Sequence, residues 1–187
     1  MRPVKFKTRM KWLFRSRSFT FLTDKLAGPD PGTTHEYSWK GTRLRYRPGT
    51  SDQALIYEIL LRPDRKADYW LPPDIHAKVV LDIGANIGIA STYLSKRFPQ
   101  AQIYAFEPIP ANFSILKANV DPLGNVRPIQ AALGATDGAI EMFPSDAETN
   151  LGGYSLYEAG SDTTLRTRVE IRRASSMMRE LNLSSAD

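Results

Sequence analysis

The stretch VVLDIGANIGIAST, from Val79 to Thr92, constrains the fold of this chain more than any other. An apolar run of strand composition passes within a few residues into a glycine-containing turn and then into a helical pattern. A strand that is followed at once by such a turn and a helix is typical of a parallel α/β sheet. The turn then lies at the carboxyl edge of the sheet, where α/β proteins bind their ligands.

The residues after this stretch continue the alternation of strands and helices. The predicted strands cover residues 79–84, 102–108 and 125–133, and the predicted helices between them cover 86–98 and 110–120. Pro110 suits the first turn of the second helix, because a missing N–H is tolerated there. Strands and helices in series with short connections predict an α/β fold, a Rossmann-like parallel sheet with flanking helices on both faces and right-handed crossovers.

The C-terminal part of the chain has a different pattern. Two further strands are predicted at 138–144 and 167–175, followed by a helix at 175–183. Between these strands lies the polar segment Ser145–Leu165, and a loop of that length in a compact domain is often functional. Asp146 and Glu148 in this loop are candidates to reach a substrate, although acids in exposed loops are usually only solvated.

The N-terminal part is basic, whereas the rest of the chain is not. Residues 1–17 contain seven Lys and Arg and no acid, although the whole chain carries a net charge of only +5. A helix there would place Phe6, Met10, Leu13 and Phe14 on one face, which suits peripheral contact with an anionic membrane surface. A basic terminus that packs loosely on the domain is the favoured alternative. Nucleic acid is not expected as a partner, because the remaining residues sum to a negative charge.

Gly and Pro divide the chain into three predicted parts. Residues 1–36 form a basic arm and a linker, residues 37–78 form a hairpin and a helix, and residues 79–187 form the ligand-binding domain. The helix of the middle part is predicted to begin with Ser51 or Asp52 at its N-cap.

Composition excludes several kinds of site. The chain has no Cys, so disulfides, thiolate metal sites and cysteine nucleophiles are excluded. His35 and His76 are not spaced as a pair of metal ligands, so no metal is predicted. No apolar run reaches 18 residues and no secretory signal follows the basic N-terminus, so a cytoplasmic protein is expected.

The spacing of small residues in the turn discriminates between ligands. Dinucleotide-binding turns have glycines at i, i+2 and i+5, whereas this turn has Gly84, Asn86 and Gly88 at i, i+2 and i+4, with Ile89 in place of the last glycine. This spacing after Asp82 is the pattern of S-adenosylmethionine (SAM) methyltransferases, whose ligand has cationic groups and no phosphate. A tight turn without a ligand, in which Asp82 satisfies the backbone, is the alternative.

A second acid ends the second predicted strand. Glu107 lies 23 residues after Gly84, where a carboxylate can accept hydrogen bonds from both hydroxyls of a ribose. An NAD-dependent oxidoreductase would also favour an acid here. The glycine spacing therefore disfavours an NAD-dependent oxidoreductase, whereas Glu107 is compatible with either function.

The segment from Val79 to Val120, with its D-x-G-A-N-x-G and F-E-P motifs and the later N-F…L-x-x-N, resembles the FkbM-type SAM-dependent methyltransferases. The resemblance covers residues 48–176 and implies that the first turn lines the methionine end and sulfonium of SAM. It implies further that Glu107 holds the ribose. The residues implied to bind the cofactor are Asp82, Gly84, Ala85, Asn86, Gly88, Glu107, Pro108, Asn112, Gln130 and Ala131. For Asn112, a plain role at the helix N-terminus is an open alternative.

The resemblance also implies an activity, the O-methylation of a hydroxyl on a sugar, glycolipid or polyketide-like small molecule, in a mostly bacterial and cytoplasmic setting. It names no catalytic base in this chain and leaves the oligomeric state open. Asp52 and the helix that contains Tyr57 would fold over the cofactor as a lid, or would serve only as a packing helix.

One departure from the family bears on function. Family members continue with a strand resembling K-I-D-x-E-G, which pairs beside the first strand, and this sequence ends before it. The C-terminal strands of the sheet are therefore expected to be missing from this chain. A SAM-binding module without turnover is the alternative to an active methyltransferase.

Overall fold

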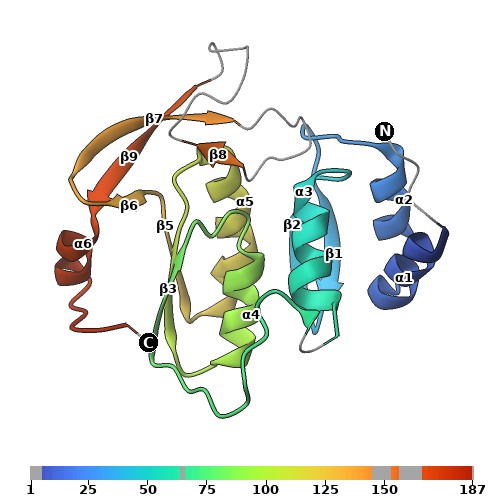
Figure 1. Cartoon of the computed structure of the whole chain (residues 1–187), viewed down its shortest axis with the longest axis horizontal. Helices are drawn as coiled ribbons and strands as arrows, with labels where there is room; N and C mark the ends of the chain where they lie inside the picture. Colours follow the sequence, from blue (N-terminus) through green and yellow to red (C-terminus); the bar gives the residue numbers. More distant parts are fainter. Residues whose placement is uncertain (1–5, 64–65, 145–152, 156–165, 187) are drawn as a thin grey trace. The chain divides into compact units, whose positions relative to one another are not determined.

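The computed structural model describes residues 6–63, 66–144, 153–155 and 166–186 (Figure 1). The chain divides into two compact units, residues 1–71 and residues 72–187. The first unit contains the basic arm together with the hairpin and the helix that follow it. The second unit contains the predicted ligand-binding turn, and each unit is described by itself.

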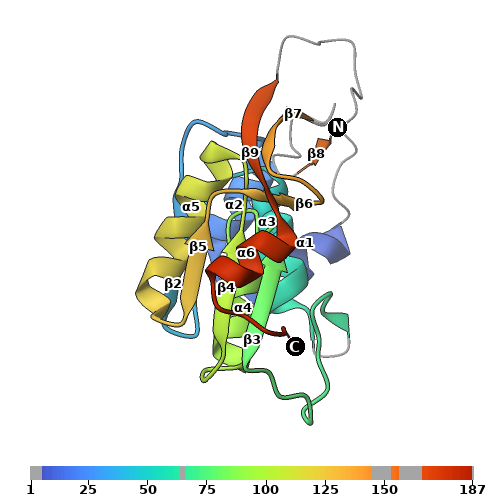
Figure 2. The same cartoon turned by 90° about the vertical axis from the view of Figure 1, so that its left-hand side faces the viewer.

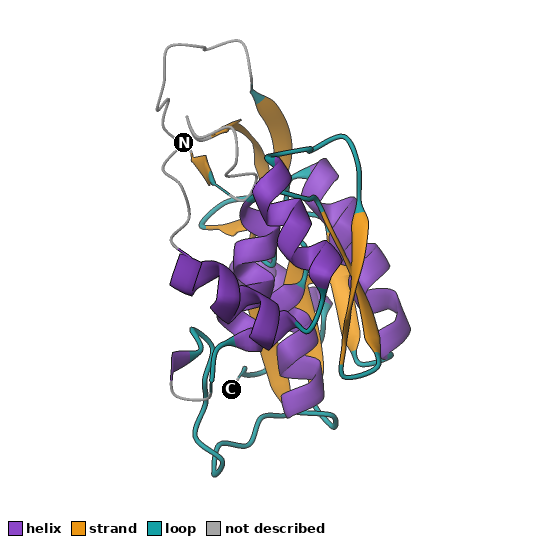
Figure 3. Cartoon of the chain, turned by 90° about the vertical axis from the view of Figure 1, so that its right-hand side faces the viewer, coloured by secondary structure: helices purple, strands orange, loops and turns teal. Residues whose placement is uncertain are grey.

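The first unit is built from two helices, a hairpin and a further helix (Figure 3). Its elements are α1 (Phe6–Ser16), α2 (Phe19–Ala27), β1 (His35–Trp39), β2 (Thr42–Tyr46), α3 (Ser51–Leu55) and the π-helix η1 (Ile56–Leu61). The hairpin pairs antiparallel, with Trp39 opposite Thr42 across a two-residue turn. Alternate residues of β2 point inward, and Leu44 and Tyr46 are fully buried with Phe21 of α2.

Side chains of α1 pack within the first unit, which the expectation of a loosely held terminus did not anticipate. Trp12 stacks on Tyr57 of η1, with the ring centroids 4.4 Å apart. Arg15 donates a hydrogen bond of 2.6 Å to the Tyr57 hydroxyl. Phe14, on the predicted apolar face, is 72% exposed.

The helix predicted in the middle part begins one residue earlier than expected. Thr50 is the N-cap, and its side-chain oxygen accepts from the backbone N–H of Asp52. Asp52 instead forms a buried ion pair with Arg47, at 2.7 Å between Oδ2 and Nε. Within the first unit Asp52 therefore stabilises the segment between the hairpin and α3.

The second unit contains the predicted parallel sheet. Strands β3 (Val79–Ile83), β4 (Gln102–Phe106) and β5 (Val126–Ile129) pair in the order β3-β4-β5. Helix α4 (Ile89–Arg97) connects β3 to β4, and helix α5 (Pro110–Val120) with the 3₁₀ turn η3 (Asp121–Leu123) connects β4 to β5. The α/β fold with a parallel sheet is thus confirmed.

A second sheet follows the first. Strands β6 (Ala132–Gly134), β7 (Gly138–Pro144), β8 (Tyr154–Ser155) and β9 (Thr167–Arg173) pair in the order β6-β9-β7-β8. Strand β6 runs parallel to β9, and β7 runs antiparallel to it. Helix α6 (Ala174–Glu180) follows β9 directly.

Helices cover both faces of the parallel sheet, as the sequence predicts (Figure 2). Met177 and Leu181, in and just after α6, pack against Tyr104 and Phe106 of β4 on one face. Helices α4 and α5 lie on the other face, to which Ile103 points. Burial on both faces explains why β4 reads as an almost continuous apolar run.

Two predicted boundaries were wrong. The strand expected over 125–133 is split into β5 and β6, because the backbone turns at Gln130 and the N–H of Ala131 donates to the carbonyl of Ile129. The helix expected from residue 86 begins at Ile89, because Asn86 and Gly88 both have left-handed backbone conformations. Asp146, Glu148 and most of the loop 145–165 lie outside the described residues.

Candidate cofactor site

The predicted acid of the first turn lies at the end of β3 and is largely buried. Oδ2 of Asp82 accepts a hydrogen bond of 2.5 Å from the Ser91 hydroxyl in α4. Burial raises the pKa of Asp82 above its ordinary value, and hydrogen bonds from the Ser91 side chain and backbone oppose that shift. The carboxyl group therefore ties the end of β3 to the first turn of α4.

Four backbone N–H groups of the turn, those of Gly84, Ala85, Asn86 and Gly88, are bonded within the protein. Gly84 and Ala85 both donate to the carbonyl of Phe106, each at 2.9 Å. Asn86 donates to Oε2 of Glu107 at 2.9 Å, and Gly88 donates to the carbonyl of Ala85 at 2.8 Å. These donors are therefore not free for a phosphate group, whereas dinucleotide- and phosphate-binding turns point such N–H groups at the ligand.

Asn86 occupies the centre of the turn and leaves one acceptor unused. Its backbone is left-handed, with φ of 51°. Its Oδ1 atom is buried and has no hydrogen-bond partner among the residues that the structure describes. A buried polar atom without a partner is costly, so its presence in a turn of this type points to a ligand that donates a hydrogen bond.

Glu107 connects the turn after β3 to the segment after β4. Its carboxylate accepts from the N–H of Asn86 through Oε2 and from the N–H of Ile109, at 3.0 Å, through Oε1. The amide of Asn112 in the first turn of α5 lies 3.5 Å from Oε1. These contacts fix the position of the carboxylate between the two turns.

The two glycines of the turn have different surroundings. A Cβ atom built on Gly84 would meet no atom within 4 Å, so the space in front of this residue is open. A Cβ atom on Gly88 would lie 2.7 Å from Cδ1 of Leu116 and 3.1 Å from Cγ1 of Val120, both in α5. Gly88 therefore allows α4 and α5 to pack closely, and Gly84 adjoins the open side of the turn.

The remaining predicted residues lie along the same edge of the sheet. Ala85 is buried inside the turn, and Pro108 is half-buried next to Glu107. Gln130 is exposed and Ala131 is buried where the chain leaves β5. The N–H of Glu107 donates to the carbonyl of Ile129 at 3.1 Å, which brings the ends of β4 and β5 together.

Two buried polar residues that support the site were not predicted. One is Ser91, which donates to Asp82, and the other is Asn119, whose amide donates to the carbonyl of Ile87 at 2.7 Å. Both side chains are fully buried. The spacing of Ser91, three residues after Gly88 in the first turn of the helix, was the only signal for it. Asn119 is the last residue of the L-x-x-N motif, which marks the position, but its partner Ile87 lies 32 residues earlier and the motif does not indicate the contact.

Comparison with known proteins identifies the family of this chain. The methyltransferase FkbM domain matches residues 82–182, which is more than half of the chain and includes the turn, Glu107 and α6. This chain belongs to the FkbM methyltransferase domain family. The resemblance noted in the sequence is thereby confirmed, and membership supports SAM as the methyl donor.

Several characterised relatives are methyltransferases. Methyltransferase sdnD of Sordaria araneosa is 30% identical over 54% of this chain and 47% of its own length. 2-O-methyltransferase NoeI of Sinorhizobium fredii is 33% identical over 42% of this chain and 32% of its own. Hexuronic acid methyltransferase AglP of Haloferax volcanii is 35% identical over 46% and 34%. The chain thus spans half or less of the length of each of these relatives.

A likeness among solved structures is weak. TYW2 of M. jannaschii in complex with AdoMet is 20% identical, with a TM-score of 0.34 over 54% of this chain and 50% of that one. This level of similarity carries no argument about the site.

The polar groups at this edge of the sheet fit a SAM-type ligand better than a dinucleotide. Acceptors predominate: Oδ1 of Asn86 lacks a donor, and the Glu107 carboxylate lies beside it. SAM offers an ammonium group, a cationic sulfonium and two ribose hydroxyls, all of which suit acceptors. Among the described residues, no group of three or more His, Asp and Glu is arranged to hold a metal ion.

Proposed function

We propose that this chain carries the cofactor-binding part of a SAM-dependent O-methyltransferase whose acceptor is a hydroxyl of a sugar, glycolipid or other small molecule. The supporting observation is the unpartnered, buried Oδ1 of Asn86 beside the open side of Gly84. The printed activities of NoeI and AglP, a 2-O-methyltransferase and a hexuronic acid methyltransferase, favour an oxygen acceptor on a sugar.

Each polar residue of the edge has a proposed role. Oδ1 of Asn86 accepts from the ammonium of the amino-acid end, and Glu107 accepts from the ribose hydroxyls. Asp82 lies beneath the turn, and a cationic ligand above it would lower the raised pKa of this carboxyl group again.

The other predicted residues complete the proposed binding edge. Gln130 and Ala131, where the chain leaves β5, border the adenine. Pro108 shapes the segment after Glu107, and Asn112 fixes that carboxylate from α5.

The chemistry requires alignment more than covalent participation by the protein. When bound, SAM would supply a methyl group, which an acceptor oxygen would take by in-line attack on the methyl carbon with S-adenosylhomocysteine as the leaving group. Holding donor and acceptor in line accounts for much of the rate of such reactions. A hydroxyl acceptor also needs a base, and the sequence names none.

The second candidate is a SAM-binding module without turnover. It would bind SAM through the same residues and transfer no methyl group. Binding without methyl transfer would distinguish it from the first proposal.

We propose in addition a cytoplasmic location with peripheral contact to an anionic membrane. The first unit contains fifteen Lys and Arg against seven Asp and Glu, a net charge of +8. The Phe14 and Phe19 side chains, at the end of α1 and the start of α2, are 72% and 70% exposed. Exposed aromatic residues among cations are typical of interfacial helices. Within the described part of the chain, no helix has the length and apolar character needed to cross a bilayer.

A calorimetric titration with S-adenosylhomocysteine, run beside NAD, tests the cofactor site. Asn86→Gly keeps the left-handed backbone and removes only the side-chain amide. We expect this variant to lose affinity by roughly 1–3 kcal/mol. Asn182→Gly is the matched control, because Asn182 is also left-handed but exposed, and its affinity should not change.

Binding of NAD, or unchanged affinity in Asn86→Gly, would contradict the assignment of this turn to SAM. Turnover is tested separately by incubating the chain with SAM labelled at its methyl group and a panel of sugars and uronic acids. Labelled product supports the transferase, and binding without product supports the module.

A further inference from the structure

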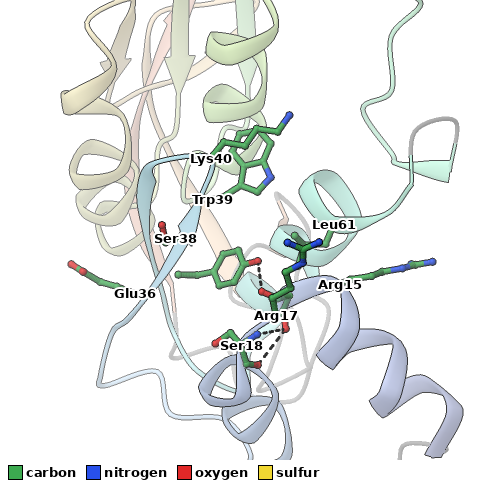
Figure 4. Close-up of a pocket in the computed structure, with 10 residues that line it drawn as sticks. Arg15, Arg17, Ser18, Glu36, Ser38, Trp39, Lys40 and Leu61 are labelled. Atoms are coloured by element: carbon green, nitrogen blue, oxygen red, sulfur yellow. Dashed lines mark hydrogen bonds between the residues drawn. The ribbon is translucent and has the colours of Figure 1, made fainter.

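A cavity of about 630 Å³ lies in the first unit and has no part in the proposed methyltransferase site (Figure 4). It is bounded by the corner between α1 and α2, by β1 and by the hairpin turn. Its lining residues include the cations Arg15, Arg17 and Lys40, the ring of Trp39, and the hydroxyls of Ser18 and Ser38. One acid, Glu36, also borders it.

The backbone at two of these cations is unusual. Apart from asparagines and glycines, Arg17 and Lys40 are the only described residues with positive φ, at 51° and 46°. Asn and Gly tolerate this conformation, and other residues adopt it at an energetic cost. Both exceptions are cations, and both line the same cavity.

Each cation occupies a position at which glycine or asparagine is the ordinary choice. Arg17 follows the last residue of α1, and its N–H donates to the carbonyl of Leu13 at 2.9 Å. This is the left-handed position that ends helices, usually with Gly. Lys40 precedes Gly41 in a two-residue hairpin turn with positive φ at both residues, for which Asn-Gly is preferred.

The charges of the two cations are not neutralised by neighbouring acids. Among the described ion pairs, neither Arg17 nor Lys40 takes part, and the Lys40 ammonium lies 5.0 Å from the centroid of the Trp39 ring. Glu36 is within 4 Å of Arg43 and Arg45 on the exposed side of the hairpin. Figure 4 shows the Arg17 side chain directed toward Trp39 and Leu61, whereas Glu36 and Arg15 point outward.

Other features of the cavity also favour an anion. Ser18 caps the nine-residue helix α2 by accepting from the N–H of Phe21 at 3.1 Å, so the positive end of this helix adjoins the cavity. The Ser18 hydroxyl keeps its own proton to donate.

We propose that this cavity binds a phosphate group through Arg17 and Lys40. Guanidinium and ammonium groups with nearby hydroxyls form the donor set that phosphate oxygens require, and a guanidinium can bind two of them at once. The phosphate belongs either to a soluble phosphate ester or to a phospholipid headgroup. The site is independent of the SAM turn, so either proposal can fail without the other.

Because both cations occupy glycine-type positions, binding can be separated from folding. Arg17→Gly and Lys40→Gly remove the charge and relieve the backbone. We expect each variant to melt at the same temperature as the unsubstituted chain or a few degrees above it. We also expect each to bind phosphate at least about tenfold more weakly, because a charged hydrogen bond is lost. Arg43→Gln, which removes one charge of the same hairpin outside the cavity, is the matched control.

The probe for a soluble ester is glycerol 3-phosphate, titrated by calorimetry at fixed ionic strength with glycerol as the blank. The probe for a headgroup is a phosphatidylcholine vesicle with or without phosphatidylglycerol, measured by sedimentation. Binding of either probe that both glycine variants weaken and Arg43→Gln preserves would support the site and identify the source. Absence of binding to both probes, equal weakening by Arg43→Gln, or a lower melting temperature of the glycine variants would overturn it.

Discussion

The two glycines of the turn provide a test that separates packing from ligand binding. Gly88→Ala places a methyl group 2.7 Å from Cδ1 of Leu116 and 3.1 Å from Cγ1 of Val120, at φ of +82°. The left-handed backbone costs about 1–2 kcal/mol for a residue with a Cβ atom, and overpacking between two helices costs a further 1–3 kcal/mol or so. We therefore expect a loss of roughly 2–5 kcal/mol in the free energy of unfolding.

Gly84→Ala meets the same backbone penalty without the clash. Its φ is +78° and its Cβ atom meets no atom within 4 Å, so we expect a loss of only about 1–2 kcal/mol. The new methyl group does enter the open side of the turn, where the ligand is proposed to lie. Affinity for S-adenosylhomocysteine should fall by more than the loss of stability explains.

Thermal unfolding and calorimetry on the same preparations measure both effects. A loss of 1 kcal/mol lowers Tm by about 2–4 °C for a chain of this size. Gly88→Ala should therefore lower Tm by roughly 4–20 °C and Gly84→Ala by no more than about 8 °C. The reasoning is refuted if the two variants are equally destabilised, or if folded Gly84→Ala binds S-adenosylhomocysteine like the unsubstituted chain.

Three further substitutions test the buried polar contacts. Burial raises the pKa of Asp82, so the contribution of this group to stability is present below the ordinary pKa of 3.8 and is lost as pH rises through the raised pKa. Asp82→Asn should therefore flatten the dependence of the unfolding free energy on pH in that window, as measured by denaturant titration. Asn119→Ala leaves the buried carbonyl of Ile87 without its donor and should cost about 1–3 kcal/mol in denaturant unfolding, whereas Lys117→Ala on the exposed side of the same helix should cost less than about 1 kcal/mol. Asp52→Ala leaves Arg47 buried without its carboxylate and should cost about 3–5 kcal/mol, and an unchanged Tm would contradict a structural role for this pair.

The sequence predicts those parts of the fold that local pattern determines. Strands β3 and β4 are short apolar runs bounded by turn residues, and Pro110 fits the first turn of α5, so these elements were predicted with small errors. Helix α2 was not predicted. Ser18 caps it by accepting from the N–H of Phe21, but a serine alone is a weak signal, and the burial of Phe21 cannot be read from the sequence.

Long-range contacts explain what the sequence could not predict. The strand over 125–133 splits because β6 pairs with Ile171 and its neighbours in β9, about 40 residues later in the chain. Gly88 resembles Gly84 in the motif, and only Leu116 and Val120 of a different helix reveal that it serves packing. The predicted grouping of Asp82, Asn86 and Glu107 needs no such information, since strand ends in a parallel sheet meet at one edge.

The backbone hydrogen bonds of the turn give a physical reason for the spacing of its small residues. Glu107 accepts from the N–H of Asn86, and the carbonyl of Phe106 accepts from the N–H groups of Gly84 and Ala85. These three donors are therefore not available to a phosphate group. A turn closed in this way offers acceptors instead, from the Asn86 amide and the Glu107 carboxylate. We therefore expect the turn to disfavour a phosphate group and to favour a ligand with an ammonium and hydroxyl groups, in agreement with the proposed SAM site.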